Sequence, residues 1–321
     1  MMFRISKKRW LYLLLALLLL CSCALAEDTN VAALKGPTAM GMVKMMDDDA
    51  GAHYNFEICA SADEITPRLV RGEIDVAALP ANLAAVLYNR TDGALEVLAV
   101  NTLGVLYIAE RGDAIHSVGD LRGRTIYSAG KGSTPEFALN YILRENGLEP
   151  GKDVTVEFKS EHSECLAALM ADSTAAALLP QPFVTTALLK AQDMRVALDL
   201  TQEWDALQSE GGSAMITGVA VARRAFVEEN PELVSAFLED YAASVDYARA
   251  DVSGAAQLIE KYDIVPAAVA EKALPGCNIC CITGDEMKAK LSGYLAVLHA
   301  ADPDSVGGAL PGDDFYYGAG A

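Results

Sequence analysis

Four short segments place glycine or proline beside hydroxyl and amide side chains, directly before apolar stretches with helical spacing. They are residues 35–38 (KGPT), 79–82 (LPAN), 130–134 (GKGST) and 180–183 (PQPF). The first backbone N–H groups of a helix have no intrahelical partner and carry a partial positive charge. Segments of this kind are typical of sites that bind an oxyanion or a carbonyl group.

Eight residues in these segments are candidate ligand contacts. Glycine allows the backbone to approach a ligand closely, and hydroxyl and amide side chains supply hydrogen-bond donors and acceptors. An aromatic ring supplies an apolar wall or a stacking surface. The candidates are Gly36, Thr38, Asn82, Gly132, Ser133, Thr134, Gln181 and Phe183.

A purely structural interpretation stays open for each candidate. Ser133 and Thr134 suit the start of a helix, Pro135 suits its first turn, and Glu136 could complete a capping box with Ser133. Asn82 would also serve as a helix cap, and Phe183 as a core residue. The repeated placement of the four segments favours ligand binding more than any single residue does.

The chain shows no pattern that predicts catalysis, a cofactor or a metal. His162 and Cys165 are three residues apart and could share a helix face, but proximity alone does not make a nucleophile. The GKGST segment is not a phosphate loop, because Gly132 follows Lys131. The CNICC run at 277–281 lacks the second pair of ligands that a zinc site needs, which favours structural or free thiols.

An internal repeat at an offset of 100 residues predicts the architecture. Residues 56–80 and 156–180 each read as a strand, a helix, a second strand and a proline before another helix. The predicted strands are 55–59 and 76–79 in one copy, and 155–159 and 175–179 in the other. Strands that alternate with helices indicate an α/β fold with two similar lobes.

The connections predict a hinge of two segments. Residues 100–112 read as one strand that leads toward the second lobe, and residues 214–226 as the strand that returns. We therefore expect lobe 1 to comprise residues 34–118 and 218–321, and lobe 2 residues 119–217, with a ligand cleft between them.

The N-terminus has the layout of a secretory signal, with four Lys and Arg residues before an apolar run at 11–20. Cleavage after Ala26 would release a soluble protein, whereas a lipobox would leave Cys23 as a lipid-modified first residue. We favour the lipobox, with residues 1–22 as signal peptide and 23–33 as tether. The remaining chain has 21 basic and 44 acidic residues, a formal net charge of −23, which argues against nucleic acid as a partner.

The segments LKGPTAMGMVKMM, EIDVAALPANLAAVLYN, SVGDLRGRTIYSAGKGSTPEFALNYIL and LLPQPFVTTALL together resemble substrate-binding proteins of ABC transporters. The resemblance is to the nitrate, sulfonate, taurine and thiamine-precursor group. It implies a type II periplasmic-binding-protein fold, without enzymatic activity or cofactor. It also implies ligand contacts at Thr38, Asn82, Ser133, Thr134 and Gln181.

The resemblance further implies the extracytoplasmic component of an ABC importer. Such a protein captures a small organic anion or heterocycle by hinge closure and delivers it to a membrane permease with a cytoplasmic ATPase. The expected form is a monomer, held by a lipid anchor at the outer face of a bacterial cell membrane or free in the periplasm. Two alternatives stay open: a ligand sensor for a membrane receptor, and an enzyme on the same fold that resembles pyrimidine-precursor synthases.

Overall fold

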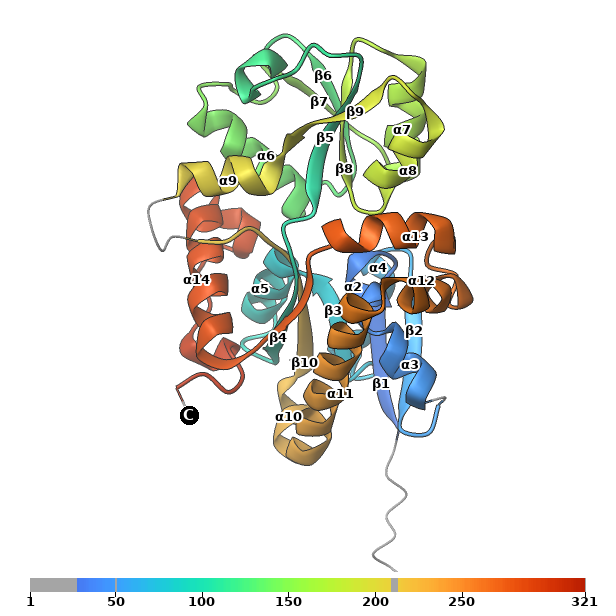
Figure 1. The fold of residues 1–321 in the computed structure, drawn as a ribbon. Helices are drawn as coiled ribbons and strands as arrows, with labels where there is room; N and C mark the ends of the chain where they lie inside the picture. Colours follow the sequence, from blue (N-terminus) through green and yellow to red (C-terminus); the bar gives the residue numbers. More distant parts are fainter. Residues whose placement is uncertain (1–27, 50, 209–212, 321) are drawn as a thin grey trace, which may run out of the picture.

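The computed structural model describes residues 28–49, 51–208 and 213–320. The chain forms two α/β lobes, each built around its own sheet (Figure 1). The six-stranded sheet of lobe 1 has the order β11-β4-β10-β3-β1-β2, and the five-stranded sheet of lobe 2 the order β7-β6-β8-β5-β9. The predicted signal peptide and Cys23 lie outside the described residues.

Lobe 1 is formed by the N-terminal and C-terminal parts of the described chain. Its strands are β1 (Thr29–Leu34), β2 (Tyr54–Cys59), β3 (Val76–Pro80), β4 (Leu95–Leu103), β10 (Ile216–Arg223) and β11 (Ile279–Ile282). Its helices are α2 (Pro37–Met40), α3 (Val43–Asp49), α4 (Ala62–Arg71), α5 (Ala81–Arg90), α10 (Arg224–Glu229), α11 (Pro231–Ala250), α12 (Val252–Lys261), α13 (Ala267–Ala273) and α14 (Gly284–Ala301).

Lobe 2 is formed by the middle of the chain. Its strands are β5 (Leu106–Arg111), β6 (Thr125–Ser128), β7 (Thr155–Phe158), β8 (Ala176–Pro180) and β9 (Met194–Asp199). Its helices are α6 (Thr134–Glu145), α7 (His162–Ala171), α8 (Phe183–Lys190) and α9 (Leu200–Leu207). The described residues also form short 3-10 helices: η1 (Val118–Leu121) in lobe 2, and η2 (Leu274–Gly276), η3 (Pro303–Val306) and η4 (Asp313–Phe315) in the C-terminal part of the chain.

The two sheets share one topology. In lobe 1, β1 pairs in parallel with β2 and β3, and β10 runs antiparallel between β3 and β4. In lobe 2, β6 pairs in parallel with β7 and β8, and β5 runs antiparallel between β8 and β9. The predicted repeat is thus present as β2-α4-β3-α5 and β7-α7-β8-α8, and each lobe receives one strand after the chain has crossed from the other.

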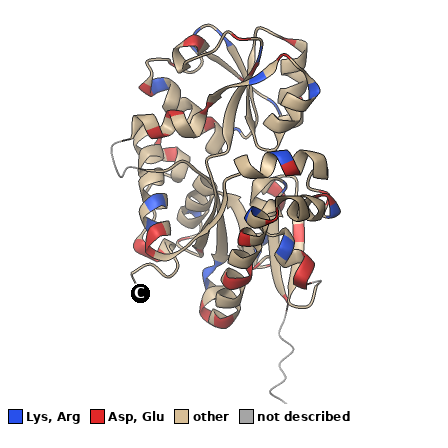
Figure 2. Cartoon of the chain, viewed as in Figure 1, with Lys and Arg blue, Asp and Glu red and all other residues tan. Residues whose placement is uncertain are grey.

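Local sequence accounts for the repeated elements. The central strands β3 and β8 are buried except at their final proline, as expected for strands covered by helices on both faces. Helix α4 begins with a capping box between Ser61 and Glu64, ends at Gly72 in the left-handed conformation, and buries Ile65 and Leu69. Acidic and basic side chains are spread over the outer helices of both lobes (Figure 2). Among the described residues, no helix is long and apolar enough to span a membrane.

Two predicted boundaries are wrong. Residues 100–112 form two strands in different sheets, so the chain crosses at Gly104–Val105 and β5 already belongs to lobe 2. Glycine is required there because a Cβ on Gly104 would lie 2.1 Å from the hydroxyl oxygen of Thr201. The predicted tether also extends too far, because β1 begins at Thr29 and lies inside the first sheet.

Candidate functional site

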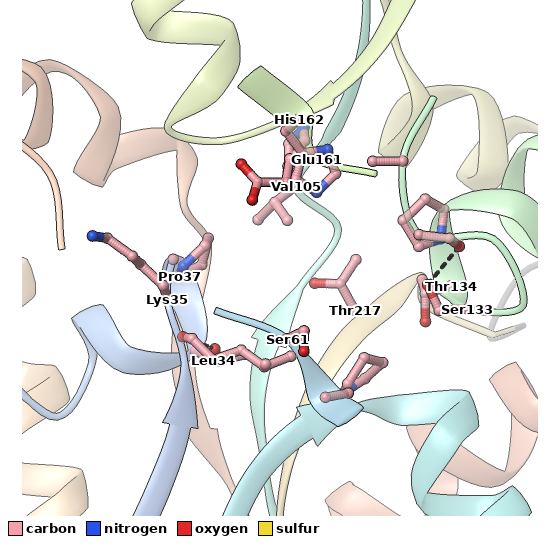
Figure 3. A pocket seen from close by; sticks show the side chains of 18 of the residues that line it. Leu34, Lys35, Pro37, Ser61, Val105, Ser133, Thr134, Glu161, His162 and Thr217 are labelled. Carbon is pink, nitrogen blue, oxygen red and sulfur yellow. Dashed lines mark hydrogen bonds between the residues drawn. The ribbon is translucent and has the colours of Figure 1, made fainter. Parts of the chain in front are cut away.

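A cavity of about 520 Å³ lies between the lobes (Figure 3). Its walls are the loops that follow β1, β2 and β3 in lobe 1 and β6, β7 and β8 in lobe 2. Its floor includes Thr102, Val105, Leu106 and Thr217, which belong to or adjoin the strands at the crossings. Sites in α/β sheets are expected at the carboxyl ends of strands, and the volume suits a small organic molecule.

Most of the predicted contacts meet at this cavity. Seven of the eight line its wall: Gly36, Thr38, Gly132, Ser133, Thr134, Gln181 and Phe183. The glutamine carboxamide is held by α8, because Gln181 Oε1 accepts a hydrogen bond of 2.7 Å from the Thr185 hydroxyl.

Asn82 departs from the prediction. Its side chain is 1% exposed and lies behind the cavity wall. Its Nδ2 donates to the Ser305 carbonyl at 3.1 Å, and its Oδ1 accepts from the Thr134 hydroxyl at 3.2 Å. Because Asn82 belongs to α5 of lobe 1 and Thr134 to α6 of lobe 2, the pair joins the two lobes.

The loop after β1 turns at a conformation that only glycine adopts easily. Gly36 has φ 137° and ψ −154°, and the Thr38 hydroxyl donates to the Leu34 carbonyl at 2.7 Å. The ammonium of Lys35 lies 3.6 Å from Asp263 and points away from the cavity (Figure 3). The backbone of this loop therefore faces the site, while its charge is turned outward.

The loop before α6 is closed by its own side chains. The Ser133 hydroxyl donates to the Gly130 carbonyl at 2.7 Å, and Glu136 Oε2 accepts from the Gly132 N–H at 2.6 Å. The predicted capping box between Ser133 and Glu136 is therefore wrong, because the carboxylate reaches one residue further back. Gly130 and Gly132 have φ values of 78° and 75°, which allow this tight loop.

Two loops of the site were missed at the sequence level. The loop after β2 contributes Ser61 and Asp63, and the loop after β7 contributes Ser160, Glu161 and His162. The internal repeat contained the signal, because both loops lie between a repeated strand and a repeated helix.

His162 and Phe183 form an aromatic wall on the lobe 2 side. Their ring centroids are 5.2 Å apart, with the planes inclined at 44°. The Nδ1 atom of His162 is buried without a hydrogen-bond partner. Burial lowers the pKa of His162 to about 4, so the imidazole is uncharged at neutral pH.

Comparison with protein families decides the assignment. Residues 39–270 match the family described as ABC transporter, phosphonate, periplasmic substrate-binding protein. The chain belongs to this family. Its members are extracytoplasmic substrate-binding components of ABC importers and not enzymes, which removes the enzymatic alternative. A search of curated proteins finds no match to the chain.

Solved structures confirm the fold of this substrate-binding protein. An ABC transporter protein from Parabacteroides distasonis has a TM-score of 0.75 at 23% identity, over 90% of this chain and 98% of that one. The aliphatic sulphonate binding protein SsuA from Escherichia coli has a TM-score of 0.71 at 18% identity, over 88% and 90%. The alkanesulfonate-binding protein SsuA from Xanthomonas axonopodis pv. citri, bound to MOPS, has a TM-score of 0.65 at 17% identity, over 89% and 94%. The predicted periplasmic-binding-protein fold is thereby confirmed.

The described cysteines of this substrate-binding protein lie in surroundings that disfavour the thiolate. The five within the described ranges are unpaired and buried or half-buried. Burial raises the pKa of Cys165 to about 11 and that of Cys277 to about 12, so both stay protonated thiols at neutral pH. The described part of the chain assembles no group of three or more side chains that could hold a metal ion.

Proposed function

We propose that this protein captures one small organic molecule between its lobes and delivers it to a membrane permease with a cytoplasmic ATPase. The supporting observation is a cavity of about 520 Å³ whose walls come from both lobes. The chain crosses twice between these lobes. A ligand that contacts both walls binds the closed form more tightly than the open form. The difference between these two binding free energies shifts the population toward the closed form.

Two ligand classes stay open from the sequence: a small anion such as nitrate, a sulfonate or a taurine-like compound, and a heterocycle such as a thiamine precursor. The description of the family names phosphonate, and the two SsuA structures are described as sulfonate-binding, which supports an anion. The rings of Phe183 and His162 in the cavity wall support a flat heterocycle.

We also propose export through the N-terminal signal, a lipid anchor on Cys23 and a monomeric binding unit. The signal layout of residues 1–22 and the small residue before Cys23 support the anchor. The protein would then act at the outer face of the cell membrane, beside its permease.

Native mass spectrometry of residues 23–321, purified gently, tests the capture of a ligand. We expect a bound small molecule that leaves on partial unfolding. The double variant Thr134→Ala/Gln181→Ala should bind this molecule at least about tenfold more weakly. The Gln181 substitution removes a polar group from the wall, and the Thr134 substitution removes the hydroxyl that joins the wall to Asn82 of the other lobe. Ser235→Ala, on the exposed side of α11, is the matched control and should bind like the wild type. Unchanged affinity in the double variant would show that the cleft is not the binding site.

A further inference from the structure

The helix starts around the cleft differ from those of a typical anion site. In three of them, a glutamate of the same helix accepts the hydrogen bond of the loop N–H. Glu64 bonds to Ser61 N at 3.1 Å before α4, Glu136 to Gly132 N at 2.6 Å before α6, and Glu164 to Ser160 N at 2.9 Å before α7. Each carboxylate occupies one loop N–H group and places a negative charge near the positive end of the helix dipole.

The other three helix starts each have a proline at the N-cap or first position. Pro37 is the first residue of α2, Pro80 precedes α5, and Pro182 precedes α8. Proline has no backbone N–H, so each of these helix starts lacks one donor. In each of the six loops, one backbone N–H group is thus either bonded to a carboxylate or absent at a proline.

Lys35 and Lys131 also line the cavity, but each ammonium group lies beside another group. The Lys35 ammonium pairs with Asp263 at 3.6 Å, and the Lys131 ammonium lies 5.8 Å from the centre of the Phe158 ring. No arginine occurs among the described residues that line the cavity. The wall thus lacks the guanidinium groups that proteins commonly use for phosphonate or sulfonate oxygens.

Acidic and aromatic side chains line the cavity as well. Asp63 and Glu161 line it, and the Glu161 carboxylate projects into the open space between the lobes (Figure 3). The neighbouring rings of His162 and Phe183 line the same wall. An aromatic face attracts a cation, and a nearby carboxylate strengthens this attraction.

We infer that the cleft is a site for a small organic cation, held between the Glu161 carboxylate and the rings of Phe183 and His162. The inference rests on the proposed function and narrows it. A heterocycle or amine with a protonated or quaternary nitrogen fits the charges, whereas a phosphonate or sulfonate would face carboxylates behind three of its potential donor loops.

Thiol labelling within the cleft tests this charge preference without any ligand. Ser133→Cys places a thiol on the cavity wall, and Ser235→Cys places one on the exposed surface of α11. Each variant is labelled at low ionic strength with the trimethylammonioethyl and the sulfonatoethyl methanethiosulfonates, which differ in the sign of their charge. The wild type, whose described cysteines are buried or half-buried, measures the background.

The quantity that decides is the ratio of the cationic to the anionic labelling rate. We expect this ratio to be about tenfold higher in the cleft than at the α11 surface. Adding Glu161→Gln should lower the cleft ratio by about threefold, because it removes a negative charge from the cavity wall that carries the two rings. Glu229→Gln, an exposed change of equal charge on α10, should leave it unaltered.

Equal ratios at the two sites, or faster anionic labelling in the cleft, would overturn the inference. A copurified ligand that carries a phosphonate or sulfonate group would overturn it as well, while the proposed capture function would stand. A protein that binds no small molecule would instead contradict the proposed function, and the labelling ratio would still report the charge of the cleft.

Discussion

Asn82 shows how the role of one side chain depends on neighbours that are distant in the sequence. It lies at the start of α5, where a ligand contact and a helix cap were both reasonable. Its hydrogen-bond partners are the Gly132 carbonyl, the Thr134 hydroxyl and the Ser305 carbonyl, which are 50, 52 and 223 residues away. No local pattern encodes these partners, so only the folded chain reveals that Asn82 joins the lobes.

Asn82→Ala should therefore loosen the contact between the lobes. The substitution leaves the buried Thr134 hydroxyl and the Ser305 carbonyl without this partner, which should lower the free energy of unfolding by about 1–3 kcal/mol. Urea denaturation measures this loss, and small-angle scattering measures the separation of the lobes.

Asn89→Ala is the control for that variant. Asn89 lies on the same helix and donates to the Val306 and Ala309 carbonyls at 2.8 and 2.7 Å, both within lobe 1. The Asn89→Ala variant should have a lower free energy of unfolding than the wild type, and its lobes should stay as close together as in the wild type. An equal change in scattering for both variants would contradict a specific link between Asn82 and lobe 2.

His162 gives the protein a predictable dependence on pH. Its pKa is about 4 in the folded protein and about 6.5 in an unfolded chain, so the unfolded state binds more protons between these values. The free energy of unfolding should fall as the pH falls from about 6.5 to 4, by at most about 3 kcal/mol. Above pH 7 this contribution is constant.

Urea denaturation of the wild type and His162→Gln at pH 7 and pH 4.5 isolates this effect. The carboxylates of Glu161 and Glu164 are present in both proteins, so their contributions cancel in the comparison. The wild type should therefore lose more stability on acidification than the variant. If both lose the same amount, the imidazole is not held in its uncharged form by burial.

At the scale of elements, the repeated units were predictable because their signals are local. Each has an apolar strand, a proline and a helix whose apolar residues recur at helical spacing, as in α4 with Ile65 and Leu69. The crossing at Gly104 was not predictable, because the residues on either side form a nearly continuous apolar run. Only the close approach of Thr201, which is distant in sequence, explains why the run is interrupted there.

Gly36→Ala tests whether the first loop of the site requires its unusual backbone. A Cβ on Gly36 would meet no atom within 4 Å, so its cost is conformational only. A non-glycine residue in this region should lower the free energy of unfolding by about 1–3 kcal/mol. Denaturation of Gly36→Ala measures this loss.

Gly119→Ala is the matched control for the backbone effect. Its φ lies outside the left-handed region, and an added Cβ would lie 3.5 Å from the Ser117 hydroxyl, an ordinary contact. Gly119→Ala should lower the free energy of unfolding by less than Gly36→Ala does. Equal losses would mean that the loop before α2 rearranges without strain.

At the scale of the whole molecule, the position of the site was predictable and its charge was not. Loops at the carboxyl ends of parallel strands meet between the lobes whatever their sequence, which explains why seven of the eight predicted contacts line the cavity. The charge depends on which way each side chain turns. The Glu136 carboxylate accepts a hydrogen bond from the Gly132 N–H, and the Lys35 ammonium lies outside the cavity beside Asp263. Neither contact can be predicted from the spacing of residues in the sequence.

The two lobes also meet through three aromatic rings, which gives the motion of the whole molecule an optical signal. Trp204 on α9 is fully buried, with its ring centre 4.8 Å from that of Tyr141 on α6 and 5.2 Å from that of Tyr294 on α14. Its indole N–H donates to the Ser213 hydroxyl at 3.0 Å. Because α6 belongs to lobe 2 and α14 to lobe 1, separation of the lobes must open this cluster.

Trp204 is the only tryptophan after residue 22, so residues 23–321 emit from this position alone. The open form admits water to the indole, and its emission should move to longer wavelength; closure on a ligand should move it back. Asn82→Ala should therefore emit at longer wavelength than the wild type, and Asn89→Ala should not. Scattering could show that the lobes of Asn82→Ala are separated while its emission is unchanged. That result would mean that Trp204, Tyr141 and Tyr294 move as one body, and that the hinge lies elsewhere.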